Sequence, residues 1–307
     1  MSFYENNILN RQLPKNICSM FEENRIFHAI VFEGEDLGRL KEYALAFAGR
    51  IMCEGDSTSG MCGSCIHCQK VLKQVHKDVI FLSSANGNYT KEAIRNMRIE
   101  VFKTPVEGKA KVYIFERIED MSEEVQNLLL KIIEEPPANT YFVMTSKNRY
   151  LLLNTIVSRV VSVNIQPLSV ADCEKRLKLF YPNNDKLHEI AIITNGNYDE
   201  AEKIVTDEKI GKKYMQCVKA FICLCKGDRY NFLSNMYSFE KDRKSYDEAI
   251  NIMLSLLKNN EFMEKFNLKS KKKLRLYDVL NNSLEKSSLM VQLQILSILI
   301  VENSCNI

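Results

Sequence analysis

Five short apolar runs, rich in β-branched and aromatic residues, alternate with helical patterns in the first half of this 307-residue chain. Such alternation is typical of βαβ units, in which helices cover both faces of a parallel sheet. The pattern therefore predicts an α/β domain at the start of the chain. The expected strands are residues 29–32, 79–82, 111–115, 141–146 and 161–165.

The clearest helix is expected after Met121. Ser122 can cap it, two glutamates suit its positive end, and a Pro-Pro pair starting at Pro136 stops it. Apolar residues at helical spacing should face the core, namely Val125, Leu128, Leu129, Ile132 and Ile133. The following run should be a buried strand whose carboxyl end is polar, where open α/β sheets place their sites.

From about Gln166 onward no further β-branched strand is evident, and the pattern is helical. Asn195 and Gly196 indicate a turn between two helices. A second stretch with strong helical periodicity begins near Glu208. We predict an α/β domain over residues 1–165, a small helical domain over 166–207 and a larger helical domain over 208–307.

Composition excludes several classes of protein. The N-terminal residues lack the apolar stretch of a secretory signal, so a cytoplasmic location is expected. The longest apolar run, 289–301, contains polar residues and falls short of the roughly 20 residues that a membrane span needs. In a reducing compartment the ten cysteines should be thiols, catalytic groups or metal ligands rather than structural disulfides.

Four of these cysteines follow the spacing C-x8-C-x2-C-x2-C. Thiolates two residues apart in a tight turn can face one ion, and tetrahedral zinc takes four such ligands. Gly60 and Gly63 let the chain fold back around the ion, while His67 and His76 lie nearby but are not needed as ligands. The spacing predicts a structural zinc module over residues 53–68, held by Cys53, Cys62, Cys65 and Cys68.

Two other uses of the four cysteines stay open. They could be unligated thiols, or they could hold an iron–sulfur cluster, although the ferredoxin pattern has a further Cys followed by Pro. In the zinc interpretation all four positions around the ion are filled. No position is left for water or substrate, so the expected role is structural.

The segments FHAIVFEGE, QVHKDVIFL, KVYIFERIEDMSEEVQNLLLKIIEEPPANTYFVMTS and LLLNTIVSR, together with the cysteine motif, resemble the bacterial clamp-loader AAA+ family. The resemblance covers most of the first 165 residues in unbroken order. It implies an AAA+ α/β domain, a small helical lid domain and a helical collar domain used in assembly. It also implies a hetero-pentamer with gamma/tau and delta subunits, which acts on a sliding clamp and primer–template DNA, with no membrane partner.

The phosphate-binding loop of that family is altered in this chain. The loop needs G-x4-G-K-[ST], with lysine for the phosphates and a hydroxyl for Mg²⁺. The corresponding segment, GEDLGRLK, keeps Gly34 but has Arg39, Leu40 and Lys41 where Gly, Lys and Thr are expected. Its two acidic residues carry the same sign of charge as a phosphate. ATP is therefore not expected to bind productively.

Two further positions differ from the family pattern. Glu116 and Arg117 stand where an active relative carries Asp-Glu, so a carboxylate for Mg²⁺ remains but the water-polarising glutamate is replaced by a cation. Asp199 falls near the position of the family's second-sensor arginine. We therefore expect no intrinsic ATPase activity.

One catalytic element of the family is retained. Ser158 and Arg159 match the Ser-Arg-Cys motif, whose arginine reaches the nucleotide of a neighbouring subunit, although Val160 replaces the cysteine. A guanidinium can bond two phosphate oxygens at once, so the resemblance implies an arginine finger acting in trans. The weaker interpretation of Arg159 is a structural ion pair.

Two other functions remain as alternatives. The chain could be an active ATPase of the gamma/tau type, a hypothesis that depends on the altered phosphate loop. It could also be a zinc-bearing module that binds nucleic acid without assembling into a ring. That module would carry clustered basic residues around its cysteines, and residues 53–68 contain no Arg or Lys.

Overall fold

The computed structural model describes residues 13–23, 25–55, 60–87, 89–239, 243–264 and 270–285. The chain divides after Gln166 into two compact units, which are described separately. Within the described ranges, no helix combines the length and the apolar character needed to cross a bilayer. The apolar run 289–301 lies outside them.

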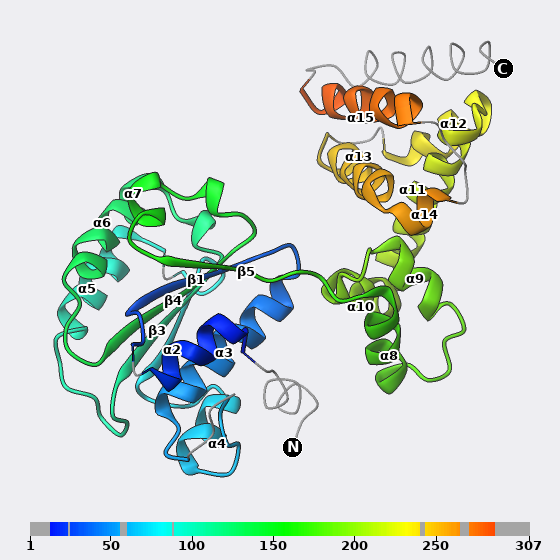
Figure 1. Ribbon diagram of the computed structural model, residues 1–307. Coiled ribbons are helices and arrows are strands. Elements are labelled where there is room, and N and C mark those ends of the chain that lie inside the picture. The colour runs from blue at the N-terminus through cyan, green and yellow to red at the C-terminus, as the bar shows by residue number, and fades with distance from the viewer. Residues whose placement is uncertain are drawn as a thin grey trace. The chain divides into compact units, whose positions relative to one another are not determined.

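The first unit contains a five-stranded parallel sheet (Figure 1). Its strands are β1 (Ala29–Glu33), β2 (Val79–Ser83), β3 (Lys111–Glu116), β4 (Thr140–Ser146) and β5 (Val161–Asn164). The order across the sheet is β2-β3-β4-β1-β5, and every pairing is parallel. All five predicted strands and the predicted α/β fold are confirmed: β1, β3 and β4 are fully or largely buried, whereas β2 is partly buried and β5 buries only Val163.

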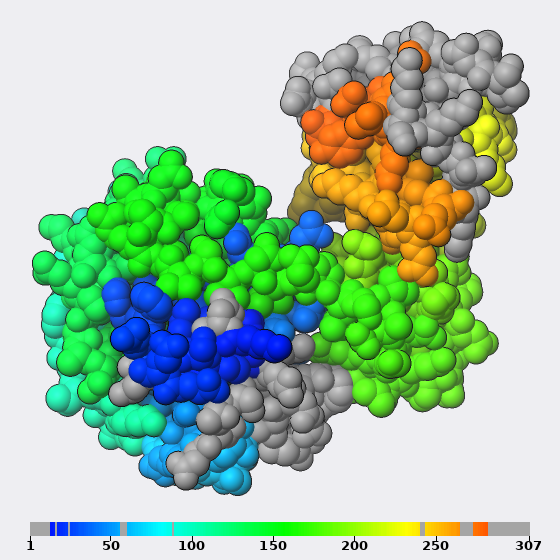
Figure 2. All heavy atoms as spheres, in the orientation of Figure 1, coloured from blue at the N-terminus to red at the C-terminus, as the bar shows by residue number. Residues whose placement is uncertain are grey.

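Helices cover both faces of this sheet, as predicted. Alternate strand residues point to opposite faces, so Ile30 and Phe32 contribute to one core while Ala29 and Val31 contribute to the other. Figure 2 shows α2 in dark blue and the cysteine-bearing segment in lighter blue on one side of this unit. The first face carries α2 (Lys15–Glu22), α3 (Leu37–Met52) and α4 (Ile66–Leu72), and the second carries α5 (Lys91–Glu100), α6 (Glu123–Glu134) and α7 (Asn154–Val157).

Helix α6 follows the predicted pattern with two differences. Ser122 occupies the N-cap position, but its side chain accepts no hydrogen bond from the helix, so the expected side-chain cap is absent. Leu128 is only partly buried, and the polar Gln126 is buried instead. The Gln126 amide donates to the Met121 carbonyl and accepts from the Leu153 backbone, which satisfies a polar group at a core position.

In the second unit, helices share one hydrophobic core. They are α8 (Val170–Phe180), α9 (Leu187–Ile193), α10 (Tyr198–Thr206), α11 (Glu208–Lys226), α12 (Arg229–Met236), α13 (Arg243–Lys258), α14 (Asn260–Glu264) and α15 (Ser270–Glu285). Asn195 and Gly196 form the expected turn between α9 and α10, both with positive φ. A Cβ at Gly196 would lie 1.9 Å from the Leu168 carbonyl oxygen, so only glycine fits. A separate lid and collar within this unit remain a prediction.

Candidate metal centre and altered nucleotide site

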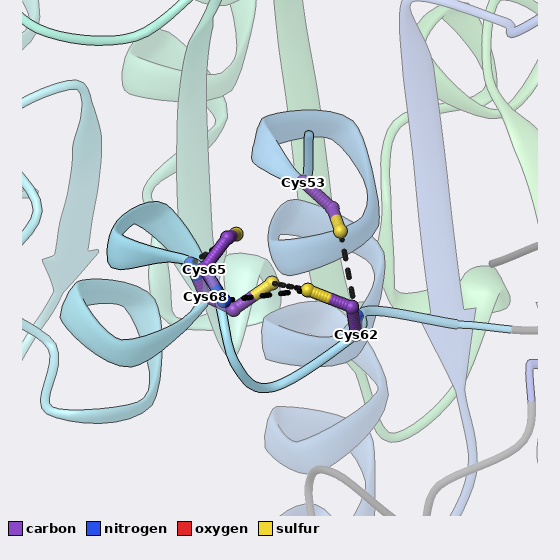
Figure 3. A group of neighbouring side chains, drawn as sticks. All are labelled: Cys53, Cys62, Cys65 and Cys68. Atoms are coloured by element: carbon purple, nitrogen blue, oxygen red, sulfur yellow. Dashed lines mark hydrogen bonds between the residues drawn. The ribbon is translucent and has the colours of Figure 1, made fainter. Parts of the chain in front are cut away.

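The four cysteines of the motif converge at the end of α3 and the start of α4 (Figure 3). Cys53 follows the last residue of α3, and Cys65 is the N-cap of α4. All four Sγ atoms lie within 4.8 Å of one another, and the Sγ atoms of Cys62 and Cys68 are 3.8 Å apart. Sulfurs at about 2.3 Å from one tetrahedral ion are separated by about 3.8 Å, so the arrangement can hold a metal such as zinc.

Backbone and hydroxyl donors surround these sulfurs. The N–H groups of Gly55 and Cys62 donate to Cys53 Sγ over 3.2 and 3.4 Å, and Cys68 N–H donates to Cys65 Sγ over 3.4 Å. The Ser64 hydroxyl and the Cys65 backbone N–H donate to Cys62 Sγ, and such donors lower the pKa of that thiol to about 6. Such donors stabilise thiolates, the form that binds metal.

The pKa values of the Cys62 and Cys68 thiols are shifted in opposite directions. Burial raises the pKa of the Cys68 thiol, opposite to the shift at Cys62. A bound cation would favour the thiolate form at both positions. The two nearby histidines are not part of the sulfur group, because His67 Nδ1 and His76 Nε2 lie 2.9 Å apart and bond to each other.

Asp78 is a buried carboxylate next to this module that sequence reasoning missed. Its oxygens accept backbone hydrogen bonds from Val106, Glu107 and Gly108, at 2.7, 2.8 and 2.7 Å. Burial alone would raise the pKa of Asp78, but these three donors outweigh it and hold the pKa below its usual range. The carboxylate thereby fixes the loop that precedes β3.

We expect Asp78→Asn to lower the free energy of unfolding by about 2 kcal/mol at neutral pH, because an amide N–H₂ would face backbone donors. A depressed pKa contributes stability above the unfolded pKa, and that contribution is lost as pH falls through the folded value. The difference in the free energy of unfolding between wild type and Asp78→Asn should therefore be constant around neutral pH and should shrink below about pH 4. Denaturant titrations across pH test this, with the exposed Asp185→Asn as control. An equal loss at pH 3 and pH 7 would contradict it.

The altered phosphate loop lies between β1 and α3. The Asp36 carboxylate caps α3 by accepting the Arg39 N–H over 3.0 Å, which places a negative charge at the helix end that a phosphate would need. Leu40, at the position of the phosphate lysine, is fully buried in the core. Gly34 is required for packing, because a Cβ there would lie 2.5 Å from the Ile165 carbonyl oxygen.

Lys41 and Glu116 form an ion pair that the sequence did not predict. Lys41 Nζ lies 2.5 Å from Glu116 Oε1, and the two side chains are 32% and 25% exposed. The carboxylate that was expected to remain for Mg²⁺ is therefore engaged by a cation of the chain itself. The backbone of Arg117 has a left-handed conformation, with φ of 55°. Its guanidinium forms an ion pair with Asp120 at 2.9 Å. These residues do not fit a Mg²⁺–nucleotide complex.

Three other sequence-predicted residues, Ser158, Arg159 and Asp199, are exposed or partly exposed. Arg159 is exposed after α7, where its Nε lies 2.6 Å from Glu134 Oε1 and its Nη1 donates to the Thr155 carbonyl at 2.9 Å and to the Ser158 hydroxyl at 3.1 Å. The weaker interpretation, an ion pair, is thus present within the chain. Asp199, in the first turn of α10, is bonded to Lys203 at 2.6 Å.

Comparison with known proteins places the chain in one group of replication proteins. The family described as DNA polymerase III, delta subunit, matches residues 9–169. The chain is 27% identical over 265 residues to DNA polymerase III subunit delta' of Bacillus subtilis, covering 84% of this chain and 79% of the relative. It is 27% identical over 177 residues to subunit gamma of Buchnera aphidicola, and 28% identical over 165 residues to subunit tau of Salmonella typhimurium. The match to subunit gamma covers 57% of this chain and 48% of the relative. The match to subunit tau covers 54% of this chain and 26% of the relative.

Among solved structures, a DNA polymerase III gamma subunit-related protein of Thermotoga maritima aligns with a TM-score of 0.47 and 17% identity, covering 93% of this chain and 98% of that one. The Bacillus subtilis DNA clamp loader delta protein aligns with a TM-score of 0.37 and 10% identity, covering 94% and 99%. The family match covers more than half of this chain. The chain therefore belongs to the DNA polymerase III delta subunit family, and the clamp-loader resemblance that its motifs predicted is confirmed, with similarity to a delta-prime subunit over most of its length.

Proposed function

We propose that this chain is the delta-prime subunit of a DNA polymerase III clamp loader and that it does not hydrolyse ATP. The observation that carries the proposal is the state of the phosphate loop. Leu40 is buried, the Asp36 carboxylate caps α3, and Lys41 is bound to Glu116. The buried Arg39 side chain donates to the Gln166 carbonyl, so none of positions 39–41 holds a cation that is free for the phosphates. A carboxylate stands where helix N–H groups would receive the phosphates.

In this proposal the chain contributes to catalysis through its neighbour. The exposed Arg159 follows α7, and its intrachain ion pair with Glu134 is a partly exposed one of the kind worth about 0–1 kcal/mol. Arg159 can therefore leave Glu134 and bind a phosphate held by an adjacent subunit at little cost in free energy. The partners are gamma/tau and delta subunits in a hetero-pentamer, which loads the sliding clamp on primer–template DNA. Zinc held by the four cysteines stabilises the region between α3 and α4.

The isolated chain should show only background ATP turnover at saturating ATP and Mg²⁺. It should also show no saturable binding of labelled ATP up to about 1 mM, since the loop offers no phosphate cradle. Equilibrium dialysis and a phosphate-release assay test this, with a gamma-type ATPase subunit as positive control.

The alternative, an active ATPase of the gamma/tau type, draws on the similarity to gamma and tau subunits and on the retained carboxylate of Glu116. It predicts turnover by this chain that a substitution at Lys41 abolishes. That result would replace the proposal. Binding without turnover would retain the nonhydrolytic role and show that the pocket holds nucleotide passively.

A further inference from the structure

Lys41 and Glu116 occupy two positions that serve one metal ion in phosphate-loop NTPases. In the pattern G-x4-G-K-[ST] the final hydroxyl binds Mg²⁺, and a carboxylate that ends another strand of the sheet binds the same ion. Counting from Gly34, Lys41 stands at the hydroxyl position, and Glu116 ends β3. In this chain the positions of two metal ligands therefore hold a cation and its counter-ion, 2.5 Å apart.

The position of the Lys41 ammonium is set by three elements of the fold. Leu40 beside it is buried in the core, which anchors the first turns of α3. From there Nζ reaches Glu116 on β3 and lies 5.7 Å from the centroid of the Phe81 ring on β2. A cation near the face of an aromatic ring gains electrostatic attraction, so the ring and the carboxylate favour the same place for the charge.

Two other carboxylates that follow β3 have partners of their own. Asp120 bonds Arg117 and accepts from the Ser84 hydroxyl at 2.9 Å, while Glu119 accepts the Lys147 backbone N–H at 3.2 Å. The Tyr89 hydroxyl donates to the Glu116 carbonyl at 2.5 Å, which fixes the backbone but adds no charge. Within the described residues, Lys41 is the cation in contact with the Glu116 carboxylate.

We infer that the Lys41 ammonium is a tethered cation that takes the place occupied by the divalent metal ion in phosphate-loop NTPases. The end of β3 is then joined to α3 without metal or nucleotide. This inference rests on the proposed nonhydrolytic function. The test of the inference measures the stability of the isolated chain, whereas the finger role is measured in the assembled complex. Failure of the inference can therefore be told apart from failure of the finger role.

The experiment is thermal unfolding of the full chain with and without Mg²⁺. Mg²⁺ is omitted rather than chelated, so that the cysteine site keeps its metal. The midpoint of wild type should not change on adding about 10 mM Mg²⁺. Lys41→Ala should unfold about 4 °C lower without Mg²⁺, because Glu116 loses its counter-ion, and Mg²⁺ should restore most of this loss. Lys41→Met, which keeps an unbranched apolar stem, should behave in the same way.

Two further variants isolate the carboxylate. Glu116→Gln and the double variant Lys41→Ala/Glu116→Gln should not respond to Mg²⁺, since the metal ligand is absent. Lys103→Ala is the matched control, because its ion pair with Glu100 is exposed on both sides. Its midpoint should stay near that of wild type. A wild type stabilised by Mg²⁺ as strongly as Lys41→Ala, or a Lys41→Ala protein that Mg²⁺ does not restore, would overturn the inference.

Discussion

Cys65→Ser should reduce the zinc content of the purified chain from about one equivalent to near zero. The four sulfurs converge within 4.8 Å, and removing one thiolate leaves three ligands and an open coordination position. Metal analysis of protein purified without added zinc measures this directly. The same analysis distinguishes the alternatives, because iron with sulfide would indicate a cluster, and four freely reactive thiols with no metal would indicate unligated cysteines.

Position 65 is the best of the four for this test. Cys65 is the N-cap of α4 and accepts the Cys68 N–H, and serine is itself a favoured N-cap residue. The substitution therefore removes a metal ligand while the helix keeps its cap. Cys223→Ser, in α11 of the other unit, is the matched control and should retain full zinc. A Cys65→Ser protein with full metal content would refute the assignment.

Loss of zinc should loosen the segment between α3 and α4 rather than unfold the whole chain. Cys53 and Cys68 are buried beside core residues of the first face of the sheet, whereas the second face has its own core. Limited proteolysis should therefore cut the metal-free protein within residues 53–75 while the sheet stays resistant. Amide exchange of β3 and β4 is the corresponding control, and it should change little.

The strands and most of the core could be predicted from sequence because their signal is local. Each apolar run forms a strand of the sheet, and the stripe of α6 is buried at Val125, Leu129 and Ile132. The cysteine positions could be predicted for the same reason, since ligand spacing within sixteen residues limits how the chain can fold around one ion.

The contacts that were missed join residues far apart in the sequence. The partner of Lys41 depends on β3 lying at a given place in the sheet, and strand order cannot be read from any one segment. Asp78 likewise binds a loop some thirty residues later. An ion pair is one of the two interpretations that the sequence offers for Arg159, but the sequence alone does not identify Glu134 as the partner.

Arg159→Ala should lower DNA- and clamp-stimulated ATP turnover and clamp loading by the reconstituted complex. An arginine finger that neutralises charge on a transferring phosphoryl group is worth on the order of 10³-fold or more at its own site. A ring with several sites dilutes this effect in total turnover. Arg159→Lys should rescue poorly, since an ammonium cannot form two parallel bonds with a phosphate.

Glu134→Ala separates a finger from a structural ion pair. Glu134 Oε1 is 2.6 Å from Arg159 Nε, so both Arg159→Ala and Glu134→Ala break the same intrachain pair. If the pair only supports the fold, the two variants should have equal effects. If Arg159 acts on a neighbour, Glu134→Ala should keep wild-type turnover, because the guanidinium stays available.

The decisive measurement is ATP turnover by the reconstituted clamp loader carrying Arg159→Ala, beside an assembly assay and the zinc content of the variant chain. The proposed function predicts full assembly, about one zinc per chain and a large loss of stimulated turnover, with Glu134→Ala close to wild type. Wild-type turnover in a fully assembled Arg159→Ala complex would contradict it and leave this chain as a scaffold alone.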